Sequence, residues 1–424
     1  MSAVPPYLLP ATARVDEGGR LSVGGCDVVE LADRFGTPLF VYDEAHLRAR
    51  CQEAVAAFGE GSVSYAAKAF LCTAMARLAA EEGLGLDVAS EGELHVALAA
   101  GVPPERLVLH GNNKSEAELR RALDVGVGRV VVDSDDELDR IEALVAPGDR
   151  RPEVLIRVTP GVDAHTHEYV TTGRDDSKFG FGLASGAAEA AVERARRSTA
   201  VDLVGIHAHI ASNVFLLPSF AKAVERLGPF VTGLDLPELS LGGGLGVAYV
   251  EGEESPSLSD WATVLTKACA DAGINARLAV EPGRAIVAAA AMTLYRVGTV
   301  KELPAIRTYV SVDGGMSDNP RPVLYGSGYE AFLPRATDAE RPRTVTVVGK
   351  HCESGDVVVR DATVPADLRV GDVLATPVTG AYGHSMASNY NKVPRSPVVF
   401  VADGAAREVV RRETIDDLLR LDVG

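Results

Sequence analysis

Short apolar runs alternate with amphipathic helical patterns along most of the chain, and this alternation limits the possible fold more than any other feature. Strands separated by helices pair in parallel, so the pattern predicts βα units. We count eight such runs before about residue 285, which is the number that closes a (β/α)8 barrel; a doubly wound open sheet is the alternative. The predicted strands cover residues 62–67, 85–88, 107–110, 129–132, 154–158, 203–209, 238–241 and 277–280.

The alternation of strand-like and helical patterns ends after about residue 285, which indicates a second domain. Strand-like runs follow one another with turns and few helical patterns between them, which is typical of a mainly β domain. The N-terminal segment has one alternating stretch near residues 21–29 and is expected to join it, and residues 413–420 are expected to form a short helix. We predict a barrel over residues 36–285 and a β-rich, sandwich-like or barrel-like domain from residues 1–35 and 286–424. The strand-like runs cover residues 308–312, 344–348, 357–359 and 397–401.

Composition narrows the class of function. A net charge of −17 argues against nucleic acid or an anionic membrane as a partner. The chain has no run of eighteen apolar residues and no basic segment followed by an apolar core at its N-terminus, so we expect neither a membrane span nor a secretory signal. The 5 cysteines show no CxxC spacing, which favours reduced thiols in the cytoplasm over disulfides or a zinc site.

Polar side chains follow the ends of most of the predicted barrel strands. The C-terminal strand ends of a barrel form one rim, where active sites lie. Helix capping explains an aspartate or a serine at this rim, but it does not explain a lysine, an arginine, two histidines and a glutamate together. The sequence therefore predicts an active site there. The rim residues are Lys68, Asp87, Glu93, His110, Asn112, Asn113, Asp133, Arg157, His207, His209, Gly242, Gly243, Gly244, Glu281 and Arg284.

Two His-x-His pairs raise the alternative of a metal-dependent hydrolase barrel. Residues i and i+2 of a strand face the same way, so His207 and His209 could both be metal ligands. His165 and His167 form the second pair. A metal site leaves Lys68 and the later glycine run without a role, and we therefore predict no metal.

Three further motifs carry chemical information. Gly242-Gly-Gly-Leu-Gly246 lacks the spacing of a dinucleotide site, but its backbone N–H groups can bind a phosphate; a plain tight turn is the alternative. Glu281-Pro-Gly-Arg284 brings a carboxylate past the last strand, and the Pro-Gly turn directs it into the rim. Cys352 has polar residues on both sides, which disfavours a buried structural thiol.

Taken together, these residues resemble the alanine-racemase-like barrel family of pyridoxal-phosphate enzymes, and within it the diaminopimelate decarboxylases. The likeness extends from about residue 37 to residue 391, and the motifs follow one another in the family's order. The motifs are Tyr65-Ala-Ala-Lys68, Leu86-Asp-Val-Ala-Ser-Glu-Gly-Glu93, His110-Gly-Asn-Asn-Lys-Ser115, Lys178-Phe-Gly-Phe181, Glu281-Pro-Gly-Arg284, Asp318-Asn-Pro-Arg-Pro322, Cys352-Glu-Ser-Gly-Asp356 and Gly380-Ala-Tyr382.

The resemblance implies that pyridoxal 5′-phosphate is the cofactor and that Lys68 forms the Schiff base with it. His209 would stack on the pyridine ring, and Glu281 would face the ring nitrogen. Ser212, the glycine turn and Tyr382 would surround the phosphate. The implied cofactor-binding residues are Lys68, Asp87, Arg157, His209, Ser212, Gly242, Gly243, Gly244, Glu281, Pro282, Gly283, Arg284 and Tyr382.

The same resemblance implies decarboxylation of meso-2,6-diaminopimelate to L-lysine and CO2, the last step of lysine biosynthesis. Two arginines and a tyrosine would hold the distal carboxylate, and Glu353 the distal amino group. Cys352 would protonate the carbanion, so the implied catalytic residues are Lys68, His209 and Cys352. In this family Cys352 and Glu353 reach the active site of the neighbouring subunit, which implies a homodimer with shared active sites. The implied substrate-binding residues are Arg284, Arg321, Tyr325, Glu353 and Tyr382.

The chemistry of these residue types agrees with that activity. A carboxylate such as Glu281 keeps the ring nitrogen protonated and makes the ring a strong electron sink, which favours decarboxylation over racemisation. Two arginines suit bidentate capture of a carboxylate, as a diamino diacid requires. A decarboxylase for putrescine-type products would instead need an acid at that end.

One motif departs from the family pattern. The usual His-Ile-Gly-Ser-Gln is His209-Ile-Ala-Ser-Asn213 in this chain. Ala211 adds a methyl group where the backbone approaches the phosphate, and Asn213 shortens a polar side chain. A paralogous decarboxylase that acts on a related amino acid is therefore the nearest alternative. A catalytically inactive relative that binds the cofactor or a partner is a further one.

Overall fold

The computed structural model describes residues 4–161, 177–210 and 212–424. The chain forms two compact units, which we call the barrel unit and the β unit. The barrel unit comprises Arg50–Gly246 and Ser255–Ala285, and the β unit comprises Met1–Ala49, Val247–Glu254 and Ile286–Gly424.

Parallel strands in the order β5-β6-β7-β8-β9-β11-β12-β13 form the barrel unit, and the short β10 (Phe181–Gly182) pairs with β9. Each of the eight predicted runs coincides with one strand on this path, which confirms the prediction. Strands covered by helices on the outside are rich in apolar residues, and Leu86, Ile156 and Ile206 are fully buried. The strands are β5 Ser64–Ala66, β6 Gly85–Val88, β7 Leu107–Leu109, β8 Arg129–Val132, β9 Glu153–Thr159, β11 Asp202–His207, β12 Glu238–Ser240 and β13 Arg277–Ala279.

The first and last of these strands meet and close the barrel. Val63 and Val280 form a parallel bridge. The Ser64 N–H donates to the Val280 carbonyl at 3.0 Å, and the Val280 N–H donates to the Ser62 carbonyl at 2.9 Å. An open doubly wound sheet would leave these edge groups without strand partners, so the alternative topology is excluded.

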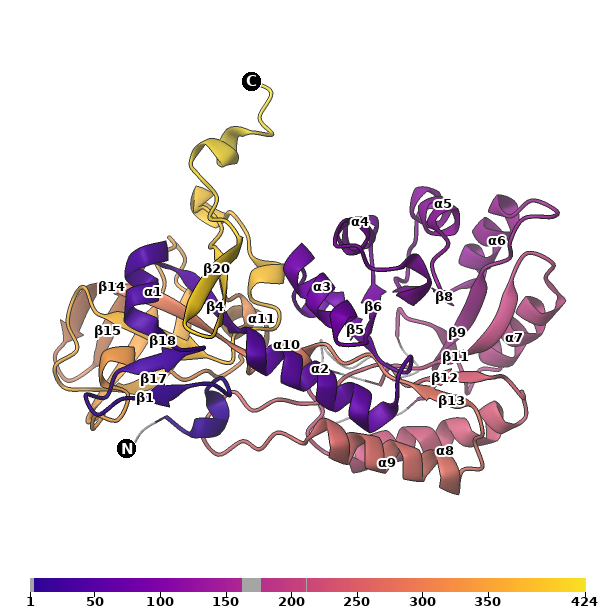
Figure 1. The fold of residues 1–424 in the computed structure, drawn as a ribbon, viewed down its shortest axis with the longest axis horizontal. Helices are drawn as coiled ribbons and strands as arrows, with labels where there is room; N and C mark the ends of the chain where they lie inside the picture. Colours follow the sequence, from indigo (N-terminus) through magenta and orange to yellow (C-terminus); the bar gives the residue numbers. More distant parts are fainter. Residues whose placement is uncertain (1–3, 162–176, 211) are drawn as a thin grey trace. The chain divides into compact units, whose positions relative to one another are not determined.

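Helices surround the ring of strands (Figure 1). Helix α5 shows how local sequence sets their bounds. The Ser115 side chain accepts the Glu118 N–H while the Glu118 carboxylate accepts the Ser115 N–H, which confirms the predicted capping box. Gly126 ends the helix in the left-handed region at a φ of 75°. The helices are α3 Thr73–Glu81, α4 Glu91–Ala99, α5 Glu116–Val125, α6 Asp135–Leu144, α7 Ala187–Arg197, α8 Pro218–Thr232 and α9 Leu258–Asp271, with α2 Glu44–Phe58 and α10 Arg284–Val287 at the unit boundaries.

The β unit contains a mixed sheet in the order β17-β16-β15-β14-β4-β19-β20, with β18 paired to β14, and a small sheet β1-β2-β3. Strand β14 is 13 residues long and pairs with β15, β18 and β4, so it connects the parts of the main sheet. The elements are β1 Arg14–Val15, β2 Leu21–Val23, β3 Cys26–Asp27, α1 Val28–Phe35, β4 Leu39–Asp43, β14 Ala291–Leu303, β15 Arg307–Val312, α11 Arg321–Tyr325, β16 Arg343–Val348, β17 Val357–Val364, β18 Val373–Pro377, β19 Val398–Ala402 and β20 Ala405–Val410.

Three local expectations differ from the structure. The predicted barrel began at residue 36, but β4 pairs with β14 and β19, so residues 39–43 belong to the sheet of the β unit. The stretch 21–29 supplies β2 and β3 and then enters α1, because the Asp27 side chain caps that helix. The C-terminal helix is only a 3-10 turn, Asp416–Leu419.

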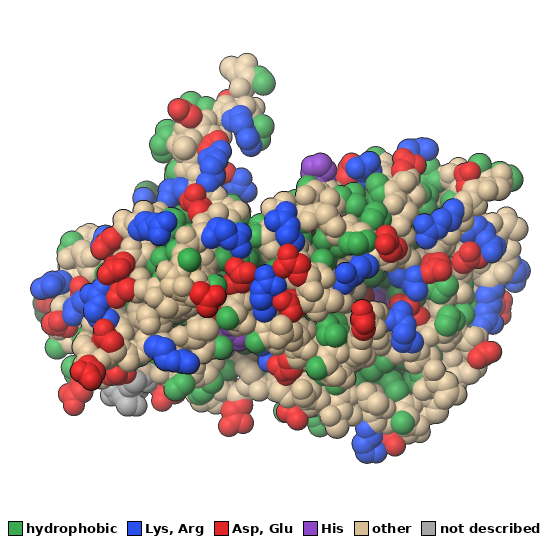
Figure 2. Space-filling view, viewed as in Figure 1, with side chains coloured by type: hydrophobic (Ala, Val, Ile, Leu, Met, Phe, Trp, Pro, Cys, Tyr) green, Lys and Arg blue, Asp and Glu red, His purple; other side chains and the backbone are tan. Residues whose placement is uncertain are grey.

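Charged side chains of both signs lie on the surface (Figure 2). Figure 2 shows basic and acidic side chains intermingled over the face that it draws. Among the described residues, no helix has both the length and the apolar character that crossing a bilayer requires. The five cysteines, all of them within the described residues, form no disulfide with one another, and Cys352 is the exposed one.

Candidate active site

A buried glutamate lies at the centre of the C-terminal rim of the barrel. Glu281 follows β13, and its two carboxylate oxygens have different partners. The Ser240 hydroxyl, at the end of β12, donates to Oε1 at 2.9 Å. His207 Nε2, at the end of β11, lies 3.0 Å from Oε2. His110 Nε2 lies 3.3 Å from Oε1, and its ring meets the His207 ring edge-on with centroids 4.9 Å apart.

The surroundings of Glu281 keep it ionised. Burial alone would raise the pKa of Glu281, but the charge of His110 and the hydrogen bond from His207 hold it well below its usual range. Burial lowers the pKa of His207 to about 4, so its ring is neutral near pH 7 and its Nε2–H donates to the carboxylate. The pKa of His110 is raised: burial opposes this, but Asp87 and Glu281 outweigh it. Glu281 is therefore a buried anion with fixed partners. An anion of this kind would stabilise a protonated ring nitrogen beside it.

Arg157 provides a second buried charge at the rim. Its guanidinium lies 3.8 Å from the Asp133 carboxylate and 4.4 Å from the centre of the Phe179 ring. The Gly180 N–H donates to the same Asp133 oxygen at 2.7 Å. Burial lowers the pKa of Arg157, and Asp133 opposes that effect. The predicted rim residues Arg157 and Asp133 are therefore brought together as an ion pair.

Lys68 lies in the 3-10 turn Ala67–Ala69 directly after β5, and its side chain is exposed. Its charge acts on three groups of the same unit. Burial raises the pKa of Asp87 and of Glu93, and the Lys68 charge opposes this in both. Burial lowers the pKa of His209 well below its usual range, and Lys68 lowers it further. The lysine therefore belongs electrostatically to the predicted rim.

The glycine turn after β12 has no room for side chains. Gly242 has a φ of 64°, and a Cβ there would lie 2.7 Å from His209 Nδ1. A Cβ on Gly243 would lie 2.3 Å from the Glu281 carbonyl oxygen. The Gly243 N–H donates to His209 Nδ1 at 3.2 Å, and the Glu281 N–H donates to the Gly242 carbonyl at 2.7 Å. The turn therefore packs too closely against His209 and Glu281 to hold side chains at Gly242 and Gly243, and its role in binding phosphate stays a prediction.

Two predictions about the histidines need correction. The strand predicted over residues 203–209 ends at His207, so His209 lies beyond β11 and the alternation of strand side chains does not apply to it. Among the described residues, the group with metal-ligand geometry is His110, His207 and Glu281, whose ligand atoms lie within 4.8 Å of one another. The pair His165 and His167 lies outside the described residues, as does Ala211.

Ser240 is a site residue that the sequence analysis missed. It is 1% exposed and stands between two leucines in a run interpreted as a buried strand. The sequence did contain a signal for this residue. Ser240 is the polar last residue of a barrel strand, and the end of such a strand lies at the rim.

Among the predicted residues in the β unit, Arg321 is buried against two tyrosines. Its guanidinium lies 4.2 Å from the centre of the Tyr249 ring and donates to the Tyr329 hydroxyl at 2.5 Å. Burial would lower the pKa of Arg321, but the neighbouring tyrosines raise it, so the side chain stays cationic. Tyr325, at the end of α11, and Tyr382 are half-buried.

Cys352 and Glu353 are exposed on the same loop of the β unit.

The last predicted residues lie in the barrel unit. Arg284 is buried at the first position of α10. A Cβ on Gly283 would lie 3.0 Å from the Ala66 Cβ, at the end of β5. The roles predicted for these residues stay predictions.

Comparisons with known proteins agree with this fold. A family model described as the pyridoxal binding domain of pyridoxal-dependent decarboxylases matches residues 44–288. The diaminopimelate decarboxylase of Actinosynnema pretiosum subsp. auranticum is 50% identical over 414 residues, covering 96% of this chain and 93% of the relative. The enzyme of the same name from Mycobacterium tuberculosis is 47% identical over 439 residues, covering 99% and 98%.

A solved structure gives the same result. The crystal structure of diaminopimelate decarboxylase from M. jannaschii in co-complex with L-lysine has a TM-score of 0.90 and 32% identity, covering 98% of both chains. This agreement confirms the predicted barrel with an appended β domain. By sequence and by fold, the chain belongs to the pyridoxal-dependent decarboxylases, within the family of the diaminopimelate decarboxylases.

Proposed function

We propose that the protein decarboxylates meso-2,6-diaminopimelate at its D-centre, with pyridoxal 5′-phosphate as cofactor, and releases L-lysine and CO2. The observation that carries the proposal is the buried Glu281 carboxylate, kept ionised by His110 and His207 in the unit that presents Lys68. A carboxylate at this position keeps a pyridine nitrogen protonated. The names of the relatives and the lysine in the M. jannaschii complex support the choice of substrate.

The rim residues fit the cofactor. Lys68 is exposed, so an aldehyde can reach its side chain, and the lack of side chains on the glycine turn lets a phosphate approach the backbone. When bound, the cofactor supplies an electron sink for the electron pair that CO2 loss leaves behind. The residues proposed to hold it are Lys68, Asp87, Arg157, His209, Ser212, Gly242, Gly243, Gly244, Glu281, Pro282, Gly283, Arg284 and Tyr382.

The chain's own residues set the electrostatics of that site. Ser240 and His207 each fix one oxygen of Glu281, so the carboxylate cannot rotate away from a ring nitrogen. His209 is neutral because burial lowers its pKa, and a neutral imidazole can lie against an aromatic ring without adding charge. Arg157 adds a buried cation beside Asp133.

Substrate recognition is proposed for a second set of residues. Arg321 offers a guanidinium fixed by two tyrosines, and fixed guanidinium groups bind carboxylates bidentately. The exposed Cys352 thiol would deliver a proton from Sγ to the substrate carbon, and Glu353 would bind the distal ammonium group. Both would act in the active site of a second copy of the chain, in a homodimer. The residues proposed to bind substrate are Arg284, Arg321, Tyr325, Glu353 and Tyr382.

The proposal is tested with purified protein, added cofactor and a panel of amino acids. Release of CO2 and formation of L-lysine from meso-diaminopimelate are expected, with far slower turnover of LL-diaminopimelate, ornithine and lysine. Lys68→Ala should abolish both turnover and the visible absorbance of the lysine-bound cofactor. Lys267→Ala is the matched control, because Lys267 is an exposed residue of α9 paired only with a neighbouring carboxylate. Light scattering in solution tests the dimer.

Two results would contradict the proposal. Turnover of another amino acid in preference to meso-diaminopimelate would identify a paralogue, as the departures at Ala211 and Asn213 allow. Visible absorbance that persists in Lys68→Ala would refute the role of Lys68. We also propose a cytoplasmic location, which the lack of disulfides among the five described cysteines supports.

A further inference from the structure

The loop that carries Cys352 is anchored from its far end by a buried aspartate. The Asp356 carboxylate accepts the His351 N–H at 2.9 Å and lies 2.7 Å from His351 Nδ1. Its other oxygen accepts the Met316 N–H at 2.7 Å. Asp356 and His351 are buried, whereas Cys352 between them is exposed. The aspartate therefore fixes the base of the loop.

A second turn of the β unit holds the cysteine directly. The Asn391 side-chain oxygen accepts the Cys352 N–H at 3.0 Å. The Tyr390 ring stacks on the His351 ring with centroids 5.6 Å apart and planes 16° apart. The backbone N–H of Cys352 thus depends on a side chain 39 positions later in the chain.

The turn that provides Asn391 has an unfavourable backbone. Asn391 and Lys392 both lie in the left-handed region, with φ of 52° and 55°. Asparagine adopts this conformation readily, but lysine does so at a cost, so contacts outside the turn must maintain it.

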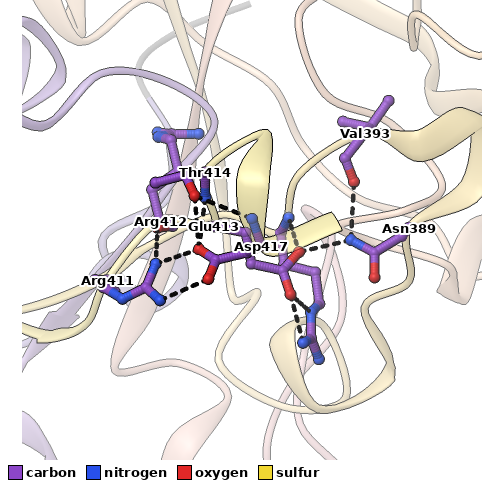
Figure 3. Close-up of polar contacts among 8 residues, drawn as sticks. Asn389, Val393, Arg411, Arg412, Glu413, Thr414 and Asp417 are labelled. Atoms are coloured by element: carbon purple, nitrogen blue, oxygen red, sulfur yellow. Dashed lines mark hydrogen bonds and ion pairs between the residues drawn. The ribbon is translucent and has the colours of Figure 1, made fainter. Parts of the chain in front are cut away.

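Glu413 supplies those contacts. One of its oxygens accepts the Asn389 Nδ2–H at 2.6 Å and the Arg395 backbone N–H at 2.8 Å. The other accepts from the Arg395 guanidinium at 2.8 and 2.5 Å. The Asn389 amide also donates to the Val393 carbonyl at 3.1 Å, which closes the turn (Figure 3). The two ends of the turn that contains Asn391 are therefore tied to one carboxylate.

The residues after Glu413 are themselves ordered. The Arg411 guanidinium pairs with both oxygens of Asp417, at 2.5 and 2.9 Å. The Thr414 N–H and hydroxyl donate to one of these oxygens, at 2.8 and 3.0 Å, so residues 411–417 form a closed polar cluster (Figure 3). Glu413 lies within this cluster, which limits how far its backbone can move.

We infer that Asn391 and Glu413 are positioning residues that set the location of the Cys352 thiol, so that the C-terminal segment takes part in the reaction without touching substrate. The inference rests on the proposed function only for what the thiol does. A purely structural role for the two residues predicts lost stability with an unchanged thiol. A positioning role predicts a changed thiol in a folded protein.

Asn391 allows a matched pair of variants. Asn391→Gly keeps the left-handed backbone but removes the acceptor of the Cys352 N–H, whereas Asn391→Asp keeps both. In the cofactor-free protein, alkylation of Cys352 by iodoacetamide, followed by mass spectrometry, should be roughly fivefold faster in Asn391→Gly, the factor that loss of one ordinary hydrogen bond gives. Asn391→Asp should match the unaltered protein. Circular dichroism confirms that each variant is folded.

A second variant tests the contribution of the C-terminal segment independently of Asn391. Glu413→Gln removes the ion pair with Arg395 and should also speed alkylation of Cys352. Glu408→Gln changes an exposed carboxylate on β20 and should leave the alkylation rate unchanged.

With meso-diaminopimelate as substrate, Asn391→Gly should lower kcat by about tenfold and change KM by less than about twofold, as a misplaced proton donor requires.

Alkylation rates that are equal in all folded variants would overturn the inference. The alkylation measurement needs neither substrate nor cofactor. Absence of decarboxylation in the unaltered protein would therefore refute the proposed function and leave the positioning of Cys352 to be decided by alkylation alone.

Discussion

Replacing Lys114 by methionine should destabilise the barrel unit more than a typical substitution of an exposed residue does. The reason is that Lys114 is a buried cation with three partners. Its ammonium donates to the Glu137 carboxylate at 2.7 Å and to the Gly111 and Val131 carbonyls at 2.7 and 2.6 Å. Lys114 is 3% exposed and Glu137 1%. Burial lowers the pKa of the lysine and raises that of the glutamate, so desolvation outweighs the attraction within the pair.

The magnitude follows from what each variant leaves behind. Lys114→Met leaves Glu137 buried without its cation, which costs about 3–5 kcal/mol of unfolding free energy. In Lys114→Met/Glu137→Met no charge remains, and only two carbonyls lose a donor, so the loss should fall to about 1–3 kcal/mol. The double variant should therefore be more stable than the single one, although it carries an additional substitution.

Urea unfolding followed by circular dichroism measures the difference, and hydrogen exchange of β8 peptides assigns it to the barrel unit. Lys267→Met is the control, since its exposed pair with Asp271 should change stability by less than about 0.5 kcal/mol. A loss below about 1 kcal/mol for Lys114→Met, or a double variant less stable than the single one, would show that Glu137 finds solvent or another partner.

Three further predictions concern the site and the β unit. Gly243→Ala should weaken cofactor binding more than about tenfold in an absorbance titration, because its Cβ would lie 2.3 Å from the Glu281 carbonyl oxygen; Gly92→Ala, with no atom closer than 3.7 Å, should not. Ser240→Ala removes one donor to Glu281 and should lower kcat by about three- to tenfold while the protein stays folded; an unchanged kcat would contradict the assigned contact. Burial raises the pKa of Asp318 to about 6, above its unfolded value, so the folded state binds the extra proton and this group adds stability as pH falls from 7 towards 4. Asp318→Asn should flatten that part of the stability-against-pH curve by up to about 3 kcal/mol in thermal or urea unfolding; identical slopes would refute it.

Sequence patterns predicted the elements well because strand and helix periods are properties of neighbouring residues. The eight barrel strands and the capping box at Ser115 and Glu118 each depend on fewer than about ten consecutive positions. The same patterns could not assign β4, because its apolar run is consistent with a barrel strand and with a strand buried between β14 and β19. They also extended the sixth strand to His209, since nothing local marks its end at His207.

The sequence by itself determined that a lysine, a glycine turn and a glutamate follow barrel strands, and hence that they meet at one rim. Only the tertiary structure decided that Glu281 has Ser240, His207 and His110 as partners. Ser240 is 41 positions away along the chain, His207 is 74 positions away, and His110 is 171 positions away (281 − 110). Parallel strands bring such distant residues within hydrogen-bonding distance, and the register that selects them depends on closure of the whole barrel. The ionisation state of Glu281 follows from that burial and those partners, so the chain's local sequence does not reveal it.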